Sequence, residues 1–371
     1  MQFVIKRDIL LKSLNYVQGV VEKKNTLPIL SNVLLQLKNK KLSVVATDLD
    51  IVFYDIISDV KIINEGSTTT SAAILYDILR KISSNSELNF ELKSQNKLSL
   101  KSDNADFNLL CLPTDNFPTF SDQFNSSEII LNNSGFLKLL NKTKISISND
   151  DTRHYLNGIY LHTNNLNGKN YLTGVATDSH RLSSSSLEVQ NMNGFSPLIL
   201  PRKTVYQLCS LLADNTDQLS MQSSENKIKF SLGNITLISK VIDGKFPDYR
   251  KVVPSNNEKT LSLPTKDFIS SIERVTSVSL DRKEGVKLLI NNNNVQLTVN
   301  SANSGEGNEV IKANFNSENL NISFNSKYLI EIASEVSAKE LRMNLKDSVS
   351  PVLIEDTNDK NSYYVIMPMK I

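Results

Sequence analysis

Residues 6–17 read Lys-Arg-Asp-Ile-Leu-Leu-Lys-Ser-Leu-Asn-Tyr-Val, and this stretch determines how the rest of the chain is interpreted. Its apolar side chains, from Ile9 to Val17, recur three and four positions apart, which places them on one face of an α-helix. Asp8 precedes them, where a side-chain oxygen can accept the first free N–H groups, so we expect it to be the N-cap. The stretch predicts a short helix with one buried face.

The same helical pattern recurs five more times along the chain, at intervals of roughly 60 to 70 residues. Each copy follows an alternating strand pattern and a polar or proline-containing start. The later copies begin after Ser71, Asn133-Ser134, Pro201, Pro264-Thr265 and Asn325-Ser326. Repetition of this kind indicates a chain built by duplication of one structural unit.

Alternating, β-branched runs lie between the predicted helices and are bounded by Asn, Asp, Gly or Lys turns. The clearest runs are Asn32 to Leu37, Lys41 to Thr47, Val52 to Ile57, Leu156 to His162, Tyr171 to Ala176, Val286 to Ile290 and Asn294 to Val299. A strand, a helix and three strands, used twice, make one α+β domain of roughly 120 to 130 residues. Three such domains fill the chain, and we place them at 1–125, 126–256 and 257–371, because Phe117-Pro118 and Phe246-Pro247 each precede a polar linker.

The composition excludes several classes of protein. The 371 residues are 40% hydrophobic and 22% charged, which is typical of a folded globular chain. Cys111 and Cys209 are too few for a disulfide framework, and no apolar run approaches the roughly 18 residues of a membrane span, so we expect a cytoplasmic protein without a membrane partner. The sequence predicts no cofactor and no metal site.

Duplicated units with strand edges can close into a ring, because the edge of one unit can pair with the next. Two copies joined head to tail would supply twelve helices, whose spacing of about 10 Å gives a circumference of about 120 Å. Such a ring leaves room for a DNA duplex. The cations expected on the solvent faces of the helices are Lys6, Arg7, Lys12, Arg80, Lys81, Lys138, Lys142, Lys144, Arg202, Lys203, Lys266, Arg274 and Lys327. They could follow phosphates without reading bases, although on charge alone, at a formal +2, ordinary solvated helix faces explain them as well.

Short motifs spread over the whole chain carry a resemblance to a known family. They are Thr26-Leu27-Pro28-Ile29-Leu30-Ser31-Asn32, Ala46-Thr47-Asp48-Leu49-Asp50, Tyr155-Leu156-Asn157-Gly158, Ala176-Thr177-Asp178-Ser179-His180-Arg181-Leu182, Phe246-Pro247-Asp248-Tyr249 and Tyr364-Val365-Ile366-Met367-Pro368-Met369-Lys370-Ile371. Together, and in this order, they closely resemble the bacterial replicative sliding clamp, the beta subunit of DNA polymerase III.

The resemblance implies the DNA-clamp fold, in which three repeated domains each pack two helices on antiparallel sheets. It further implies a non-catalytic, head-to-tail homodimeric ring that slides on duplex DNA and tethers the replicative polymerase. Implied partners are the polymerase III alpha subunit, the clamp loader and other clamp-motif proteins of replication and repair. Their short peptides would bind a pocket formed by Leu156, Thr177, His180, Arg181, Leu182, Pro247, Val252, Asn325, Tyr328, Val349, Val365, Ile366, Met367, Pro368 and Met369.

The resemblance also implies residues for DNA and for the subunit interface. Those expected to face DNA are Lys12, Lys24, Arg80, Lys138, His154, Tyr155, Arg202 and Lys203, and those expected at the dimer interface are Phe107, Leu109, Val278, Glu306 and Glu309. Family members often oppose basic residues near Phe107 to acidic residues of the third domain, but here Asn104 and Asp106 occupy the basic side. We therefore expect closure to depend on apolar contacts more than on ion pairs.

Two alternatives compete with a replicative tether. Asp48, Asp178 and His180 could belong to an enzyme acting on nucleic acid, but no serine or cysteine nucleophile motif accompanies them. Two aspartates such as Asp48 and Asp50, without further ligands, are more often turn residues than a metal site. A ring that serves repair partners alone fits the same sequence.

Overall fold

The structure is a computed structural model that describes residues 1–22, 27–120, 124, 127–192, 194–279, 285–302 and 304–370. The chain forms two units. Unit 1 comprises Met1–Leu137, Asn191–Ser196 and Lys203–Val241, and unit 2 comprises Lys138–Gln190, Pro197–Arg202 and Ile242–Ile371. The boundaries at 125/126 and 256/257 concern the repeats rather than these units and stay a prediction. Most of the linker expected at 122–127 lies outside the described residues.

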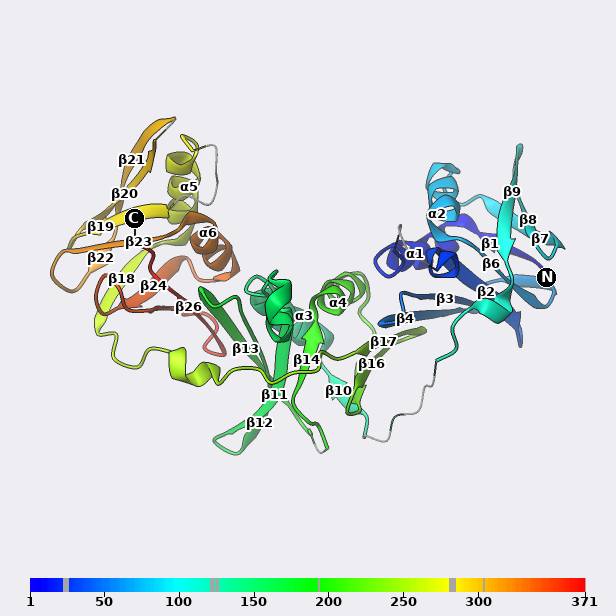
Figure 1. The fold of residues 1–371 in the computed structure, drawn as a ribbon, viewed down its shortest axis with the longest axis horizontal. Coiled ribbons are helices and arrows are strands. Elements are labelled where there is room, and N and C mark those ends of the chain that lie inside the picture. The colour runs from blue at the N-terminus through cyan, green and yellow to red at the C-terminus, as the bar shows by residue number, and fades with distance from the viewer. Residues whose placement is uncertain are drawn as a thin grey trace. The chain divides into compact units, whose positions relative to one another are not determined.

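The six helices expected from the apolar spacing are present in the described part of the chain (Figure 1). They are α1 (Arg7–Gln18), α2 (Ala72–Lys81), α3 (Asn133–Lys144), α4 (Arg202–Asp214), α5 (Thr265–Thr276) and α6 (Ser326–Glu335). None of them combines the length and apolar character that crossing a lipid bilayer requires, within the residues described.

The prediction that Asp8 caps α1 is wrong. The N-cap of α1 is Lys6, which makes no side-chain cap, and Asp8 lies inside the first turn. Its carboxylate instead accepts hydrogen bonds from the Arg7 guanidinium at 2.6 Å and from the Asn85 backbone N–H at 2.7 Å. A neighbouring loop thus competes successfully for the carboxylate.

Unit 1 is built on one sheet, antiparallel throughout, that runs through two repeats. In pairing order its strands are β10 (Ile129–Leu131), β15 (Leu219–Ser223), β16 (Lys227–Leu232), β17 (Ile235–Lys240), β4 (Ile51–Ile57), β3 (Lys41–Thr47), β2 (Asn32–Lys38), β6 (Gly66–Ser71), β9 (Ala105–Leu112), β8 (Lys97–Ser102), β7 (Glu87–Ser94), β1 (Gln2–Lys6) and β5 (Lys61–Asn64). The alternating apolar residues of these strands turn inward, and α1 and α2 lie side by side over them (Figure 1).

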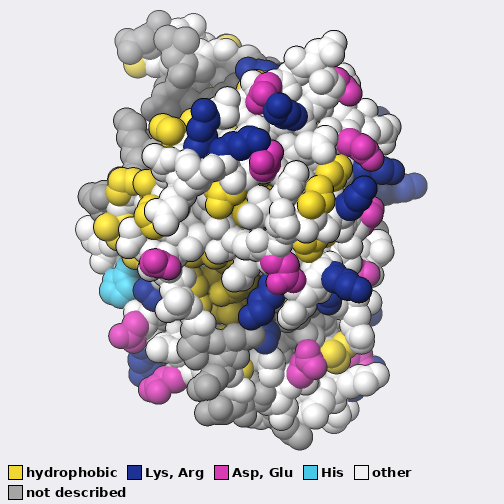
Figure 2. Space-filling view, turned by 90° about the vertical axis from the view of Figure 1, so that its right-hand side faces the viewer, with side chains coloured by type: hydrophobic (Ala, Val, Ile, Leu, Met, Phe, Trp, Pro, Cys, Tyr) yellow, Lys and Arg dark blue, Asp and Glu magenta, His cyan; other side chains and the backbone are white. Residues whose placement is uncertain are grey.

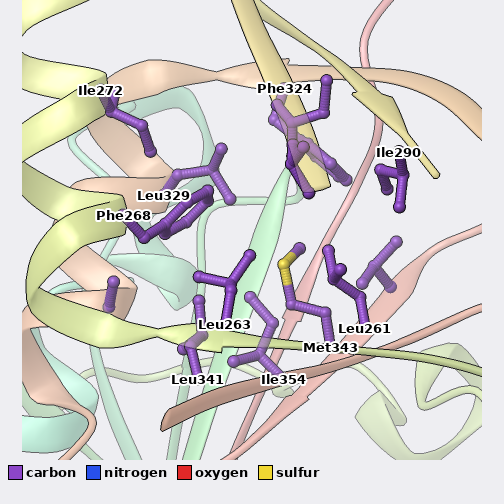
Figure 3. Packing of buried hydrophobic residues seen from close by; sticks show 14 of the residues in the cluster. Leu261, Leu263, Phe268, Ile272, Ile290, Phe324, Leu329, Leu341, Met343 and Ile354 are labelled. Atoms are coloured by element: carbon purple, nitrogen blue, oxygen red, sulfur yellow. The ribbon is translucent and has the colours of Figure 1, made fainter. Parts of the chain in front are cut away.

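Unit 2 contains two antiparallel sheets. The strands of the larger sheet are β14 (Leu198–Pro201), β11 (Gly158–Leu166), β12 (Lys169–Thr177), β13 (Arg181–Val189), β26 (Ser362–Ile366), β25 (Val352–Glu355), β24 (Glu340–Leu345), β18 (Lys259–Pro264) and β22 (Asn314–Phe315). Those of the smaller sheet are β21 (Gly305–Lys312), β20 (Asn294–Ser301), β19 (Gly285–Ile290) and β23 (Leu320–Asn325). Between them α5 and α6 bury Phe268, Ile272 and Leu329 against Met343 and Phe324 (Figure 3).

A buried ion cluster joins α3 to the loop before β26 in unit 2. The ammonium of Lys142 lies 2.8 Å from Asp356 Oδ2 and 3.1 Å from Asp359 Oδ2, and its side chain is only 5% exposed. The expectation that Lys142 lies on a solvent face is therefore wrong. Burial alone would raise the pKa of Asp359, but hydrogen bonds from Lys138, Lys142 and Ser362 outweigh it and lower that pKa to about 2. Because the folded pKa is depressed, this stabilisation is complete above pH ~4 and is lost as the pH falls toward 2.

We predict that Lys142→Ala lowers the free energy of unfolding of the protein by about 3 to 5 kcal/mol, because two buried carboxylates lose their cation. Lys138→Ala is the matched control: its ammonium pairs with Asp359 from a side chain that is 52% exposed, and its removal should cost less than about 1 kcal/mol. Urea unfolding followed by circular dichroism measures both. Equal losses in the two variants would contradict the assignment of Lys142 as the buried anchor.

Candidate functional site

The loop between β12 and β13 is held by its own side chains. Asp178 Oδ1 accepts the backbone N–H groups of His180 at 2.9 Å and Arg181 at 3.0 Å, and Thr177 Oγ1 donates to the Arg181 carbonyl at 2.7 Å. Ser179, at the tip, has a φ of 77°, in the left-handed region where Gly is the least strained residue. This turn holds the His180 side chain in solvent and turns Arg181 inward.

Arg181 joins this loop to α6. Its Nε donates to Asp178 Oδ2 at 3.1 Å, its Nη1 donates to Glu331, and its guanidinium lies 4.1 Å from the ring centre of Tyr328. The Arg181 side chain is 7% exposed, so its charge is neutralised inside the protein. Burial raises the pKa of Tyr328 above its ordinary value. Arg181 is therefore held by two carboxylates and a ring, and it links the loop to α6.

The C-terminal segment lies along the same loop. β13 pairs with β26, with Arg181 opposite Ile366 and Leu182 opposite Val365. Beyond β26 the Met367 N–H donates to the His180 carbonyl, and the Met369 N–H donates to the Ser323 carbonyl, both at 2.8 Å. The backbone is thus fixed by hydrogen bonds, while the Met367 and Met369 side chains stay 40% and 37% exposed.

An apolar cluster forms the base beneath this segment. Leu156, Leu182 and Val365 pack with Phe246 and Tyr249 in a single buried group. Apolar side chains are exposed on neighbouring segments: Val252 (52%) follows Tyr249 in the turn Tyr249–Val252, and Val349 (64%) lies in the turn before β25. Exposed apolar residues above a packed base are typical of a surface that a partner covers.

The structure brings most of the predicted pocket residues together. Leu156, Leu182 and Val365 share the apolar base, Thr177, His180, Arg181 and Tyr328 share the loop and its ring contacts, and Asn325 caps α6 through the Tyr328 N–H. Ile366 packs in the core between the sheets, whereas Pro368 lies between the two hydrogen-bonded methionines. Pro247 and Val252 are exposed next to the base residues Phe246 and Val253 in the sequence, and Val349 is exposed in the turn before β25.

Sequence reasoning missed the residues that hold Arg181 in place. Asp178 and Glu331 bind its guanidinium, and Ser323 anchors the C-terminal segment. The signal for Glu331 was its position three residues after Tyr328 on the predicted helix, which places both side chains on one face.

Several residues expected to face DNA are already engaged by neighbours. Lys203 donates to Asp48 Oδ2 at 2.5 Å and to the Val20 carbonyl, Lys138 pairs with Asp359, and Arg202 donates to Asn149. Lys12 donates to Asn215, Arg80 pairs with Asp77, His154 contacts the Asp243 carbonyl, and Tyr155 packs against the apolar base. Lys24 lies outside the described residues.

Four of the five residues expected at the dimer interface lie on two strands, β9 and β21, and the fifth, Val278, follows α5. In β9, residues 105–110 pair only with β8 among the described strands, and Phe107 lines a cavity of about 670 Å³ together with Ile74 and Ile78 of α2. Leu109 is buried in the sheet beside Phe107. Figure 2 shows one side of the molecule, where hydrophobic side chains alternate with charges of both signs. No single charge dominates that side.

The second edge is β21 in unit 2, which pairs only with β20 among the described strands. Glu309 on this strand accepts hydrogen bonds from Arg274 at 2.5 Å and from Ser271 at 2.7 Å. The Arg274 hydrogen bond is the main cause that lowers the pKa of Glu309. Glu306 is exposed and accepts from Asn308, and Val278 packs against the core of unit 2. Glu309 thus has a cation within its own unit.

The two aspartates considered for catalysis are used structurally. Asp48 Oδ1 accepts the N–H groups of Asp50 at 2.9 Å and Ile51 at 2.7 Å, as Asp178 does in its own loop. Within the residues described, no three metal-binding side chains come together. Both carboxylates therefore serve turns and ion pairs.

Comparison with known proteins gives matches over the full chain. Family models described as the N-terminal, central and C-terminal domains of the DNA polymerase III beta subunit match residues 1–121, 130–248 and 250–370. The beta sliding clamps of Caulobacter vibrioides and Escherichia coli K12 are 35% and 32% identical, with 100% of each chain covered. A crystal structure of a sliding clamp from Bartonella birtlesii bound to griselimycin superposes with a TM-score of 0.95 at 39% identity and full coverage of both chains. A Caulobacter crescentus clamp structure with bound polyethylene glycol also gives 0.95, at 36% identity, with 100% and 99% of the two chains covered.

Proposed function

Because the chain belongs to the family of DNA polymerase III beta subunits, the beta sliding clamps, we propose that it closes as a head-to-tail homodimer around duplex DNA and tethers the replicative polymerase. It is a sliding clamp and a non-catalytic processivity factor. The observation that carries the proposal is the ordered match of three family domains over the whole length. We place its action in the bacterial cytoplasm.

Two free strand edges support head-to-tail closure. Residues 105–109 of β9 in unit 1 and strand β21 in unit 2 each lack a paired strand on one side among the described residues, and a second copy of the chain offers the complementary side to each. Pairing removes exposed edges that would otherwise favour aggregation. A contact between two different edges joins the subunits head to tail. The subunits form a closed ring when the rotation from one subunit to the next adds up to a full turn.

A ring gives processivity without tight binding to any base sequence. Phosphate contacts alone allow sliding, and a polymerase held to the ring meets its template at a high effective concentration. The residues expected at the pore are largely tied to neighbours, as Lys203 is to Asp48. Such paired cations would make only weak phosphate contacts, because the neighbouring carboxylate offsets part of their charge.

We assign the surface formed by His180, Met367, Pro368 and Met369 above the Leu156 cluster as the pocket for short peptides of the polymerase III alpha subunit, the clamp loader and repair proteins. Its support is the exposed, flexible methionine side chains on a hydrogen-bonded backbone. Methionine adapts to apolar groups of different shape, so several peptide sequences can share one surface. The buried Arg181 shapes this pocket from below.

The enclosing ring is tested by retention on DNA. We expect the protein, loaded by a bacterial clamp loader with ATP, to remain on nicked circular DNA through gel filtration and to leave within seconds once the circle is linearised. A protein that binds phosphates without encircling the duplex would be retained equally on both forms. Chemical change of the DNA would instead favour the enzyme alternative.

The charge pattern at the two edges predicts a dimer that is only weakly sensitive to salt. Asn104 and Asp106 provide no cations, and Glu309 is neutralised by Arg274 in its own unit. We expect the dimer Kd, measured by sedimentation, to change by less than about tenfold between low and high salt, because screening weakens only exposed charge pairs.

The matched variant is the double substitution Asn104→Arg and Asp106→Arg, which restores cations opposite the acidic edge. It should make the dimer Kd clearly more salt-dependent than that of the natural chain. A Kd of the natural chain that rises steeply with salt would overturn the apolar account of closure.

The pocket assignment is tested by deleting residues 367–371. We expect the truncated protein to lose binding of a fluorescein-labelled peptide from the polymerase III alpha subunit, measured by anisotropy, while it still sediments as a dimer. Leu166→Ala is the control, since Leu166 is a 57% exposed apolar residue of unit 2 outside this surface. Unchanged peptide affinity in the truncated protein would contradict the assignment of this surface as the peptide pocket.

A further inference from the structure

Each unit contains an internal junction, where a strand of one repeat pairs with a strand of the next repeat. In unit 1 β4 pairs with β17, and Val52 lies opposite Ile238. In unit 2 β13 pairs with β26, and Leu182 lies opposite Val365. All four side chains are buried in the apolar clusters of these junctions. Each internal junction therefore contains one buried apolar pair across the two strands.

The backbone shows that the two apolar pairs correspond. Two residues beyond each pair, the strand pairing ends in the same hydrogen bond: the Lys240 N–H donates to the Asp50 carbonyl, and the Met367 N–H donates to the His180 carbonyl. One register thus serves both internal junctions. It can be compared with the edges of β9 and β21, which lack a paired strand on one side among the described residues.

Strand β9 occupies in the first repeat the place that β17 occupies in the second. Both strands are the second arm of a hairpin, after β8 and β16 respectively. The open end of each hairpin carries the same backbone hydrogen bond, from the Cys111 N–H to the Asn96 carbonyl at 3.0 Å and from the Val241 N–H to the Asn226 carbonyl at 3.1 Å. Asn108 therefore corresponds to Ile238, because each stands three residues before the donor of this bond.

Strand β21 occupies in the third repeat the place that β4 occupies in the first. The helix α1 packs on β3 and β4, and α5 packs on β20 and β21 in the same way. The seventh residue of β3, Thr47, lies opposite Val52, and the seventh residue of β20, Asn300, lies opposite Glu306. Glu306 therefore corresponds to Val52.

A second copy whose β21 pairs with β9 in the internal register places Asn108 opposite Glu306 of the partner subunit. Both side chains are exposed at these edges. On the basis of the head-to-tail closure proposed above, we propose that two copies join in this register and that the Asn108 amide donates a hydrogen bond to the carboxylate of Glu306 of the partner subunit. This polar pair takes the place of the buried apolar pair that each internal junction contains.

The neighbouring pair in this register is Phe107 opposite Gly307 of the partner subunit, on the side of the strands that the helices cover. Within one chain, a Cβ atom at Gly307 would lie 2.5 Å from the Val275 carbonyl oxygen, so α5 leaves no room for a side chain there. Phe107 lines the cavity beside α2 together with Ile74 and Ile78. The Phe107 ring thus supplies the apolar surface of a cross-strand pair to which a glycine contributes none.

Side-chain chemistry favours this register over its neighbours. A slip by one residue would turn the helix-side residues of one strand to the other face. A slip by two residues in one direction would set Asp106 opposite Glu306, and like charges directly opposite each other are destabilising. The same slip in the other direction would set the Glu309 carboxylate against the Phe107 ring, where burial of a charge is costly. In the proposed register Asp106 lies opposite the neutral Asn308 instead.

The register is tested by disulfide cross-linking of the full chain carrying Cys111→Ala and Cys209→Ala, oxidised with copper phenanthroline and separated on a non-reducing gel. Asn108→Cys combined with Glu306→Cys should form a covalent dimer, because directly opposite Cα atoms lie about 4.5 to 5.5 Å apart, within the range of a disulfide. Asn108→Cys combined with Asn308→Cys is the matched control, and it should cross-link at least about tenfold more slowly, since diagonal neighbours lie about 7 to 8 Å apart. Faster cross-linking of the control pair would overturn the register.

The hydrogen bond is tested by Asn108→Asp, which sets a carboxylate opposite Glu306 of the partner subunit. The dimer Kd should rise at least about tenfold, because like charges then face each other at both junctions of the ring. Adding Glu306→Gln should restore the Kd, since an amide can again donate to the carboxylate. Asn89→Asp, which changes an exposed asparagine of β7, is the control and should leave the Kd unchanged. An unchanged Kd in Asn108→Asp would refute the contact.

Sedimentation of the natural chain separates this inference from the ring itself. A dimer that cross-links through Asn108→Cys and Asn308→Cys, but not through Asn108→Cys and Glu306→Cys, contradicts the register and leaves head-to-tail closure standing. A monomer contradicts head-to-tail closure, and the register with it.

Discussion

The structure depends on one constraint: a strand at the edge of a repeat has backbone groups that its own repeat cannot satisfy. β17 meets this constraint by pairing with β4 in unit 1, and β26 does so by pairing with β13 in unit 2. The same hydrogen bond finishes each pairing, from Lys240 N–H to the Asp50 carbonyl and from Met367 N–H to the His180 carbonyl, both at 2.8 Å. The loops that receive these bonds carry the same aspartate turn. Residues 105–110 of β9 and strand β21 each lack a paired strand on one side among the described residues, and in the proposed ring a second subunit would pair with them.

The two copies of this loop differ only in the side chains that they hold. In unit 1 Lys240 pairs with Asp50 at 2.9 Å and Lys203 pairs with Asp48, so this loop carries two ion pairs. In unit 2 the corresponding positions hold His180 and the exposed methionines, and the cation is the buried Arg181. The two repeats thus share the same loop backbone. Only the copy in unit 2 carries exposed methionines, whose flexible side chains can adapt to different partners.

The sequence predicts well whatever follows from local spacing. All six helices, the main strands and the Asp48 turn follow from periodicity and turn chemistry, whereas the matching turn at Asp178 was not predicted. Lys142 and Arg181 were beyond that reasoning, because their partners lie 214 and 150 residues away. A lysine on an amphipathic helix is usually solvated, and only the fold brings Asp356 to it. The Asp8 cap failed similarly, since Asn85 is distant in sequence.

In the ring that we propose, two contributions to closure can be separated. Backbone pairing between β9 and β21 would require no particular side chain, so it would tolerate Asn104 and Asp106 at positions where the family resemblance implies cations. Two acids remain on this edge: Glu306 is exposed to solvent, whereas the half-buried Glu309 would be left without a partner at the interface, where an uncompensated charge is costly. Arg274 and Ser271 remove that cost from within the same unit. In the proposed ring, the absence of cations at positions 104 and 106 and the internal neutralisation of Glu309 would therefore act together, and both shift closure from ion pairs to the apolar contacts around Phe107.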